Sequence, residues 1–266
     1  MKVFDNDDWV ISSAGGVTGE AYLAQSQQKK LFLKRNSSPF LAVLSAEGIV
    51  PKLLWTKRLE NGDVITAQKW LEGRELKAEE MKSEQVARLL KKIHQSEPLV
   101  FMLSRLGKAA VTPQHFLTDI AEKACRFPHL SSINEAIGFL ERTVTKVGTH
   151  LKRVCHSDIN HNNWLLDEEE NLYLVDWDQA IIADPALDLA LILYWYVEET
   201  NWEAWLKDYG WPLTPHLRLR MHWYMVAQTL LFLFWHHEHG QVKETRLYLK
   251  HLRSYNRYSK ITGLFK

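Results

Sequence analysis

Cysteine is scarce in this chain, whose 266 residues contain only two, Cys125 and Cys155. Two cysteines are too few for the disulfide framework of a small secreted protein. Cys155 also lies directly before His156, and a bridge there would disrupt the polar stretch described below. We therefore expect no structural disulfide.

Long apolar runs are lacking as well. The longest, residues 186–197 and 229–235, fall short of the ~20 residues that a membrane span needs. The first eight residues are rich in Asp and lack the apolar core of a signal peptide. These absences predict a cytoplasmic protein with no membrane span.

Neither sign of charge dominates, and the net charge is +1. This balance predicts no strong global attraction to nucleic acid or anionic lipid. The apolar fraction of 46% is ordinary for a globular protein, and the length allows one large domain or two small lobes. The eleven tryptophans are many, and core packing should account for part of them.

What the chain does have is a polar stretch built around a hairpin. Two short apolar runs, residues 164–166 and 172–175, are separated by the acidic run 167–171. Asp and Asn at this position have turn chemistry, so the pattern predicts a β-hairpin.

Oxygen-bearing side chains flank this hairpin. Asp158 and Asn163 precede it and Asp176 follows it, so closing the hairpin would bring all three to one end of the ladder. Hard oxygen ligands of this kind suit Mg²⁺, which shares its shell with substrate phosphates. Taken singly, each of these residues is more often a capping or turn residue than a ligand, so the prediction depends on their joint spacing.

The spacing resembles the catalytic loop and metal loop of the protein kinase-like phosphotransferases. In His156-Ser157-Asp158 and Asn163, four residues separate the Asp from the Asn, as in that loop, and a second Asp follows after the hairpin. Trp177-Asp178 after Asp176, and Ser157 after the His, are more similar to the aminoglycoside phosphotransferase and choline/ethanolamine kinase branch. Over nearly the whole chain, the closest resemblance is to the bacterial cell-cycle-regulator phosphotransferases (the CcrZ/YtmP group).

This resemblance implies a protein kinase-like bilobal α+β fold. A small antiparallel β N-lobe with one helix, residues 1–73, would bind the nucleotide. A mainly helical C-lobe, residues 74–266, would carry catalysis and acceptor binding. Several helices are expected, either from apolar residues at helical spacing or from capping residues. They are residues 79–95, 112–125, 132–148, 185–198, 201–208, 215–236 and 242–258.

The implied activity is transfer of the γ-phosphate of ATP to a hydroxyl group, with Mg²⁺ as cofactor. Asp158 would orient the acceptor hydroxyl and take its proton, and His156 would shape the loop. Asn163 and Asp176 would hold the metal. Asp188 would brace the loop. Alternatively, an Asp in the first turn of a helix is stabilised by the helix dipole and needs no contact with the loop.

The nucleotide would be held by the N-terminal segment. A glycine-containing turn resembles the phosphate-covering flap of the family, although such turns are often only structural. Lys34 would steady the α- and β-phosphates. Glu47 ends a short helix, where the dipole disfavours a carboxylate by ~0.3–1 kcal/mol. A compensating cation is expected there, and the resemblance proposes Lys34. The expected flap contacts are Gly15, Gly16, Thr18 and Gly19.

The chain would cross between lobes near Gly73, after a hairpin predicted by Asn61-Gly62. In the family the backbone at this crossing reads the adenine. The corresponding contacts here would come from Gln68, Lys69, Trp70 and Leu71.

The acceptor is the open part of the prediction. Asp178, Trp177 and Trp195 are candidate contacts, although such aromatic residues are commonly plain core. The closest resemblance implies a nucleoside or other ribose-bearing acceptor, and the wider branch implies ethanolamine or choline, whose ammonium group aromatic rings could enclose.

Two readings from other classes stay open. The chain could be a pseudokinase scaffold with a cell-division protein as partner. Against a purely structural role, all five residues with an implied chemical role are present: Lys34, His156, Asp158, Asn163 and Asp176. The histidines of residues 236–239 could instead bind a metal, although adjacent histidines on a helix point in different directions.

Overall fold

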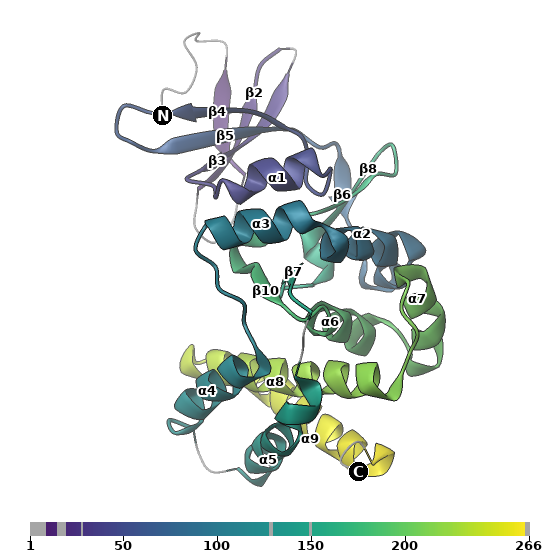
Figure 1. Ribbon diagram of the computed structural model, residues 1–266. Coiled ribbons are helices and arrows are strands. Elements are labelled where there is room, and N and C mark those ends of the chain that lie inside the picture. The colour runs from purple at the N-terminus through teal and green to yellow at the C-terminus, as the bar shows by residue number, and fades with distance from the viewer. Residues whose placement is uncertain (1–8, 15–19, 28, 128–129, 149–150, 264–266) are drawn as a thin grey trace.

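The computed structural model describes residues 9–14, 20–27, 29–127, 130–148 and 151–263, which form two lobes (Figure 1). The upper lobe contains an antiparallel five-stranded sheet. In spatial order its strands are β1 (Val10–Ser13), β2 (Ala21–Gln25), β3 (Lys30–Arg35), β5 (Val64–Lys69) and β4 (Leu53–Arg58). Leu31 and Leu33 on β3 and Ile65 and Ala67 on β5 are buried on one face, because side chains alternate across a strand, and they form a small separate core.

The lower lobe is mainly helical, as the sequence predicts. The described part of this lobe contains α2 (Glu84–Gln95), α3 (Glu97–Arg105), α4 (Pro113–Ala124), α5 (Ser131–Val147), α6 (Ala186–Tyr196), α7 (Trp202–Tyr209), α8 (Pro215–Glu238) and α9 (Val242–Thr262). Helix α3 is not anticipated by the sequence analysis. The hydroxyl of Ser96 caps it by accepting a hydrogen bond from the Leu99 backbone, and Pro98 lies in its first turn.

Helix α1 (Phe40–Ala46) follows β3 in the chain but packs against the lower lobe, where it lies beside α3 (Figure 1). Its buried residues Phe40 and Leu44 belong to the large core of that lobe rather than to the core of the sheet. An amphipathic helix turns its apolar side toward the larger apolar surface available. This packing decides where the end of the helix lies, with consequences for Glu47 described below.

The predicted hairpin forms from β8 (Trp164–Asp167) and β9 (Leu172–Leu174), with Trp164 opposite Leu174. A third strand, β6 (Gly73–Glu75), pairs with β8. A Cβ atom on Gly73 would lie 2.2 Å from the carbonyl oxygen of Leu166, so only glycine fits there. The hairpin is thereby joined to the segment that links the two lobes.

Two further short strands, β7 (Arg153–Cys155) and β10 (Ile181–Ala183), pair antiparallel inside the lower lobe. Val154 and Ile182 are buried. The chain leaves β7 directly into His156, so this ladder anchors the start of the polar loop.

Every residue of helix α6 from Ala186 to Leu193 is buried, because this helix is apolar on nearly all sides. Asp184 precedes it and accepts hydrogen bonds from the Ala186 backbone and from both ends of the Arg220 guanidinium on α8. A buried bidentate pair of this kind fixes the register between the two helices. None of the described helices combines the length and apolarity needed to cross a membrane.

His222, in the middle of α8, should make stability depend on pH. Burial lowers the pKa of this imidazole to about 3, and the ring hydrogen-bonds with Tyr194 and Ser259. The unfolded chain, with an ordinary pKa near 6.5, therefore binds more protons than the folded chain as the pH falls below that value. The free energy of unfolding should then drop by up to ~1.4 kcal/mol per pH unit on acidification below pH 6.5.

Urea unfolding from pH 7 to pH 4.5 measures this slope. The variant His222→Gln cannot titrate, so its slope should be smaller than that of the wild type. Equal slopes would assign the acid sensitivity to other groups.

Candidate active site

The polar loop after β7 holds Asp158 and Asn163 in direct contact. The Asn163 amide nitrogen donates to the backbone oxygen of Asp158 at 2.9 Å and to its carboxylate at 3.3 Å. Asn163 is buried and Asp158 is half-buried. The amide nitrogen is thus occupied, which leaves the amide oxygen of Asn163 as the atom to bind a cation.

Val175, the residue before Asp176, ties the second loop to the first. The His156 ring nitrogen Nε2 lies 2.8 Å from the Val175 carbonyl oxygen, to which it donates. The Val175 backbone N–H donates to the carbonyl of Asn163 at 2.8 Å. These hydrogen bonds hold Val175, and with it the backbone leading into Asp176, beside His156 and Asn163, the two ends of the loop that carries Asp158.

Two residues of these loops adopt left-handed backbone conformations that glycine usually takes. Ser157 has φ 65° and Asp176 has φ 66°. Such conformations cost of order 1–3 kcal/mol and persist where surrounding contacts impose them, often at functional sites. Here the Ser157 hydroxyl donates to the backbone of Gln179 at 2.7 Å, which links the two loops once more.

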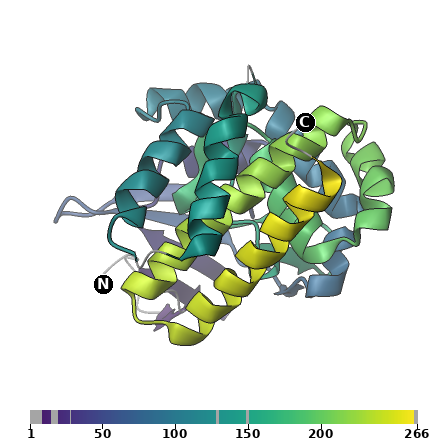
Figure 2. The same cartoon turned by 90° about the horizontal axis from the view of Figure 1, so that it is seen from below.

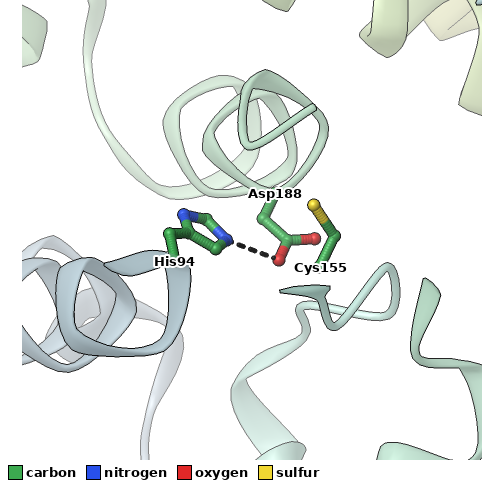
Figure 3. Close-up of side chains that lie close together, drawn as sticks. All are labelled: His94, Cys155 and Asp188. Carbon is green, nitrogen blue, oxygen red and sulfur yellow. Dashed lines mark hydrogen bonds and ion pairs between the residues drawn. The ribbon is translucent and has the colours of Figure 1, made fainter. Parts of the chain in front are cut away.

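Asp188 on α6 accepts hydrogen bonds from the loop backbone, which are the contacts expected of a brace. The N–H groups of His156 and Ser157 donate to its two oxygens at 2.8 and 2.9 Å. Behind it, the His94 ring lies 3.1 Å from the carboxylate (Figure 3). The other nitrogen of this ring lies 2.8 Å from the Tyr209 hydroxyl. The sequence analysis does not identify His94 or Tyr209, because a lone histidine at the end of an apolar helix face has no distinguishing pattern.

His94, Cys155 and Asp188 lie close enough to suggest a metal site, since their ligand atoms are within 4.8 Å of one another (Figure 3). Their hydrogen bonds argue against it. Both Asp188 oxygens accept from the loop backbone, and both His94 nitrogens have partners. Burial, followed by the charges of Asp188 and Asp184, raises the pKa of the Cys155 thiol, so it stays protonated. The cluster is a buried hydrogen-bonded support for the loop.

Lys34 pairs with Asp178 and not with Glu47, so the predicted Lys34–Glu47 pair is wrong. The Lys34 ammonium lies 3.1 Å from the Asp178 carboxylate, across the two lobes. Helix α1 packs against α3, and the carbonyl at its end accepts from Lys92 on α2 instead. The cation expected at the helix end is therefore Lys92. With side chains 27% and 62% exposed, the Lys34–Asp178 pair adds little stability, but it brings the lysine next to the loop of Asp176.

The other predicted nucleotide contacts are placed only in part. Gly15, Gly16, Thr18 and Gly19 lie outside the described residues. Gln68 is buried, and its side-chain amide donates to the Pro51 carbonyl at 2.7 Å, which gives it a structural role. Trp70 and Leu71 are half-buried between β5 and β6, and the exposed Lys69 donates its N–H to Lys52.

Two of the three candidate acceptor residues have packing contacts. The Trp177 ring lies edge-on to His156 at 4.8 Å and to Phe40 at 5.9 Å, and its N–H donates to the Leu174 carbonyl. Trp195 is half-buried, with its ring 6.0 Å from that of Phe232. Asp178 is the partner of Lys34 described above.

Two tyrosines lie close enough to Asp158 for its charge to act on them, and of these the sequence analysis misses Tyr248. The Tyr196 hydroxyl, at the end of α6, accepts from the His161 backbone at 3.3 Å, three residues after Asp158. Tyr248 on α9 stacks on His236 with ring centroids 5.0 Å apart. Burial and then the nearby Asp158 carboxylate raise the pKa of Tyr248, and Asp158 contributes to the raised pKa of Tyr196 too. Both tyrosine hydroxyls therefore lie within the electrostatic influence of Asp158, although Tyr248 follows it by ninety residues in the sequence.

The histidines of residues 236–239 do not gather as metal ligands. His236 bonds Gln241 and stacks on Tyr248, whereas His239 bonds the Trp235 carbonyl and stacks on the Trp235 ring. His237 packs on Phe127 at 4.3 Å. Each ring thus has its own local partner, and among the described residues only the buried His94 cluster has the geometry of three close ligands.

The arrangement offers a carboxylate in a rigid loop, oxygen ligands on either side of the hairpin and a lysine from the upper lobe. A carboxylate held beside an acceptor can orient a hydroxyl and take its proton. Asn163 and Asp176 are oxygen donors of the kind that suits Mg²⁺, and the oriented Asn163 oxygen and the exposed Asp176 carboxylate fit that ion.

The chain is similar to known proteins in sequence and in fold. The family model described as "Phosphotransferase enzyme family" matches residues 11–214. Choline kinase LicA from Streptococcus pneumoniae is similar in structure, with a TM-score of 0.67 and 18% identity over 93% of this chain and 95% of that one. A choline/ethanolamine kinase family protein from Mesorhizobium loti has a TM-score of 0.70 and 15% identity over 92% and 87% of the two chains. The GDP and kanamycin complex of APH(2")-IIia has a TM-score of 0.71 and 14% identity over 96% and 95%.

Proposed function

Because the chain belongs to the phosphotransferase enzyme family and is a kinase with a hydroxyl acceptor, we propose that it is an ATP- and Mg²⁺-dependent small-molecule kinase acting on a nucleoside or other ribose-bearing acceptor. One observation carries the proposal: the loop of Asp158 and Asn163 is fixed by Asp188 on one side and by the residue before Asp176 on the other. We place this activity in the cytoplasm. From the resemblance to the bacterial cell-cycle-regulator phosphotransferases, we also propose a role in cell-cycle regulation, with a cell-division protein as partner.

In this reaction the acceptor oxygen forms a bond to the γ-phosphorus, and the bond from that phosphorus to the bridging oxygen of the departing ADP breaks. The acceptor proton passes to the Asp158 carboxylate. Lys34 holds the phosphates, and Asn163 and Asp176 would hold Mg²⁺, which supplies charge neutralisation when bound. The protein thus mainly positions groups and neutralises charge. Related folds solved with AMP and with GDP support a nucleotide as the donor.

The aromatic residues near Asp158 favour a flat, partly polar acceptor. Tyr196 and Tyr248 are both close enough to Asp158 to feel its charge, and Phe232 and His236 pack against Tyr248. A nucleobase could stack on this aromatic surface while its ribose hydroxyl reaches Asp158.

A second candidate is an amino alcohol such as choline or ethanolamine. The same aromatic rings could hold an ammonium group by cation–π attraction, and two similar structures come from choline-type kinases. An aminoglycoside acceptor is disfavoured by the few carboxylates of residues 186–236, because a polyamine needs several.

An acceptor screen tests the proposal. Purified protein, ATP and Mg²⁺ are incubated with panels of nucleosides and of amino alcohols, ADP formation is followed, and the product is identified by mass. We expect a nucleoside to stimulate ADP formation and to gain one phosphate. Stimulation by amino alcohols alone would replace the nucleoside with the second candidate, and no consumption with any acceptor would favour a pseudokinase scaffold.

Tyr248→Ala should raise the KM for the nucleoside by about 5- to 100-fold while leaving the KM for ATP unchanged, because it removes the stacking surface. Tyr248→Phe keeps the ring and should restore most of the affinity. Steady-state kinetics with each substrate varied in turn measure both values.

Phe101→Ala removes another aromatic ring, 63% exposed on α3, and serves as the matched control with unchanged KM values. If Tyr248→Phe behaved like Tyr248→Ala, the hydroxyl rather than the ring would hold the acceptor. An unchanged KM in both variants would remove Tyr248 from the acceptor site.

A further inference from the structure

Helix α9 carries a continuous row of cations on its outer side. Its basic residues follow one another at intervals of three and four, which keeps them on one helix face. All six are exposed, and at 1.5 Å per residue the row is about 25 Å long. The row, which we call the basic ridge, consists of Lys243, Arg246, Lys250, Arg253, Arg257 and Lys260.

The ridge concentrates charge that the rest of the chain lacks. Helix α9 contains six cations and one acid, Glu244, whereas the whole chain has a net charge of only +1. Glu244 is not part of the ridge, since it directly follows Lys243 in sequence and so points away from that face. Within the described parts of the chain, Lys260 alone of the six has a carboxylate within 4 Å, that of Glu135 at 2.6 Å. Helix α9 is therefore far more basic than the chain as a whole.

The ridge faces outward because the opposite side of α9 is packed. Leu252, Tyr255 and Ser259 are buried against the lobe, and the half-buried Tyr248 stacks on His236 of α8. Seen from below, α9 is among the helices in the foreground and crosses the face of the lower lobe that is remote from the sheet (Figure 2). The ridge is thus presented to solvent on the outside of the lobe.

Exposed apolar side chains border the ridge. Val242, Leu247 and Ile261 are 58%, 50% and 77% exposed. None of the tyrosines of α9 is exposed, so the ridge lacks the aromatic platforms on which single-stranded nucleic acid stacks. An exposed basic helix with apolar side chains at its border fits an anionic lipid surface, which attracts the cations and accepts the apolar groups.

We propose that the outer face of α9 is a docking surface for membranes that contain anionic lipids, with the basic ridge meeting the lipid phosphates and Leu247 and Ile261 entering the interface. Contact is peripheral and reversible, because no side chain is deeply inserted and the attraction is screened by salt. The inner face of the same helix bears Tyr248, so docking brings the acceptor side of the enzyme close to the membrane. This inference does not depend on the identity of the acceptor.

Vesicle co-sedimentation tests the docking surface. The full chain is mixed at low salt with phosphatidylcholine vesicles with or without phosphatidylglycerol. We expect binding only to the anionic vesicles and release at high salt. The triple variant Lys250→Gln, Arg253→Gln, Arg257→Gln should bind about a hundredfold more weakly while keeping the wild-type phosphotransfer rate without vesicles.

The matched control removes the same charge elsewhere, with Lys82→Gln, Lys108→Gln and Lys207→Gln, and should bind like the wild type. A second variant, Ile261→Ser, should weaken vesicle binding without affecting binding of single-stranded DNA. Absence of binding to anionic vesicles, or equal losses in the ridge and control triples, would overturn the proposal. Tighter binding to DNA than to vesicles would also overturn it, in favour of a nucleic-acid surface.

Discussion

Asp158→Asn should lower kcat by about 10²- to 10⁴-fold while leaving nucleotide affinity nearly intact. The amide has almost the same shape as the carboxylate but cannot take the acceptor proton. The loop should keep its form, because the main contact of Asn163 is with the backbone oxygen of Asp158 and the brace at Asp188 binds other residues. The loss should therefore appear in the chemical step alone.

The measurement is kcat at saturating ATP and acceptor, together with the affinity for a non-hydrolysable ATP analogue. Asp208→Asn, at an exposed position on α7, makes the same chemical change away from the loop and should leave both values unchanged. A near-wild-type kcat for Asp158→Asn would remove Asp158 from its role.

The sequence predicts those parts of the fold that depend on residues adjacent in the chain. The two apolar runs and the acidic turn of residues 164–175 predict the hairpin, and the structure pairs Trp164 with Leu174. The same holds for Asn61-Gly62, where Gly62 has φ 91° in the turn between β4 and β5. Local turn chemistry and strand pattern are enough in both cases.

What the sequence could not give depends on contacts between distant segments. Helix α1 could have packed on the sheet or on the lower lobe, and only its contact with α3 decides this. That choice moves Glu47 away from Lys34 and makes Asp178 the partner of the lysine. A helix dipole argument correctly asks for a cation at the end of α1, but it cannot tell which one the fold supplies.

The loop residues can be proposed from the sequence, whereas the residues that support the loop cannot. The spacing of Asp158, Asn163 and Asp176 is a sequence pattern, and all three lie within the residues that the family model matches. By contrast, His94, which hydrogen-bonds with Asp188, and Tyr248, which we propose as an acceptor contact, come from helices far away in the chain. Their neighbours along the chain do not reveal what they contact in the fold.

Asp188→Asn should combine a loss of stability of about 3–5 kcal/mol with a lower kcat, because Asp188 is a positioning residue for the loop of Asp158. The wild-type carboxylate is fully buried and accepts from two backbone N–H groups and from His94. An amide offers one oxygen for these donors and turns its own N–H₂ group toward the others, so at least one donor stays unsatisfied in the core. The freed loop should then misplace Asp158.

Urea unfolding gives the stability, and kcat is measured at a temperature at which the variant is folded. Tyr209→Phe removes only the hydroxyl at the far end of the His94 contact, so it should cost about 1 kcal/mol and leave kcat near the wild-type value. The KM for ATP should change little in either variant, since the Lys34 side of the site is untouched. If folded Asp188→Asn kept the full kcat, the hydrogen bonds to His156 and Ser157 would stabilise the lobe without positioning the catalytic carboxylate, and the role of Asp188 would be purely structural.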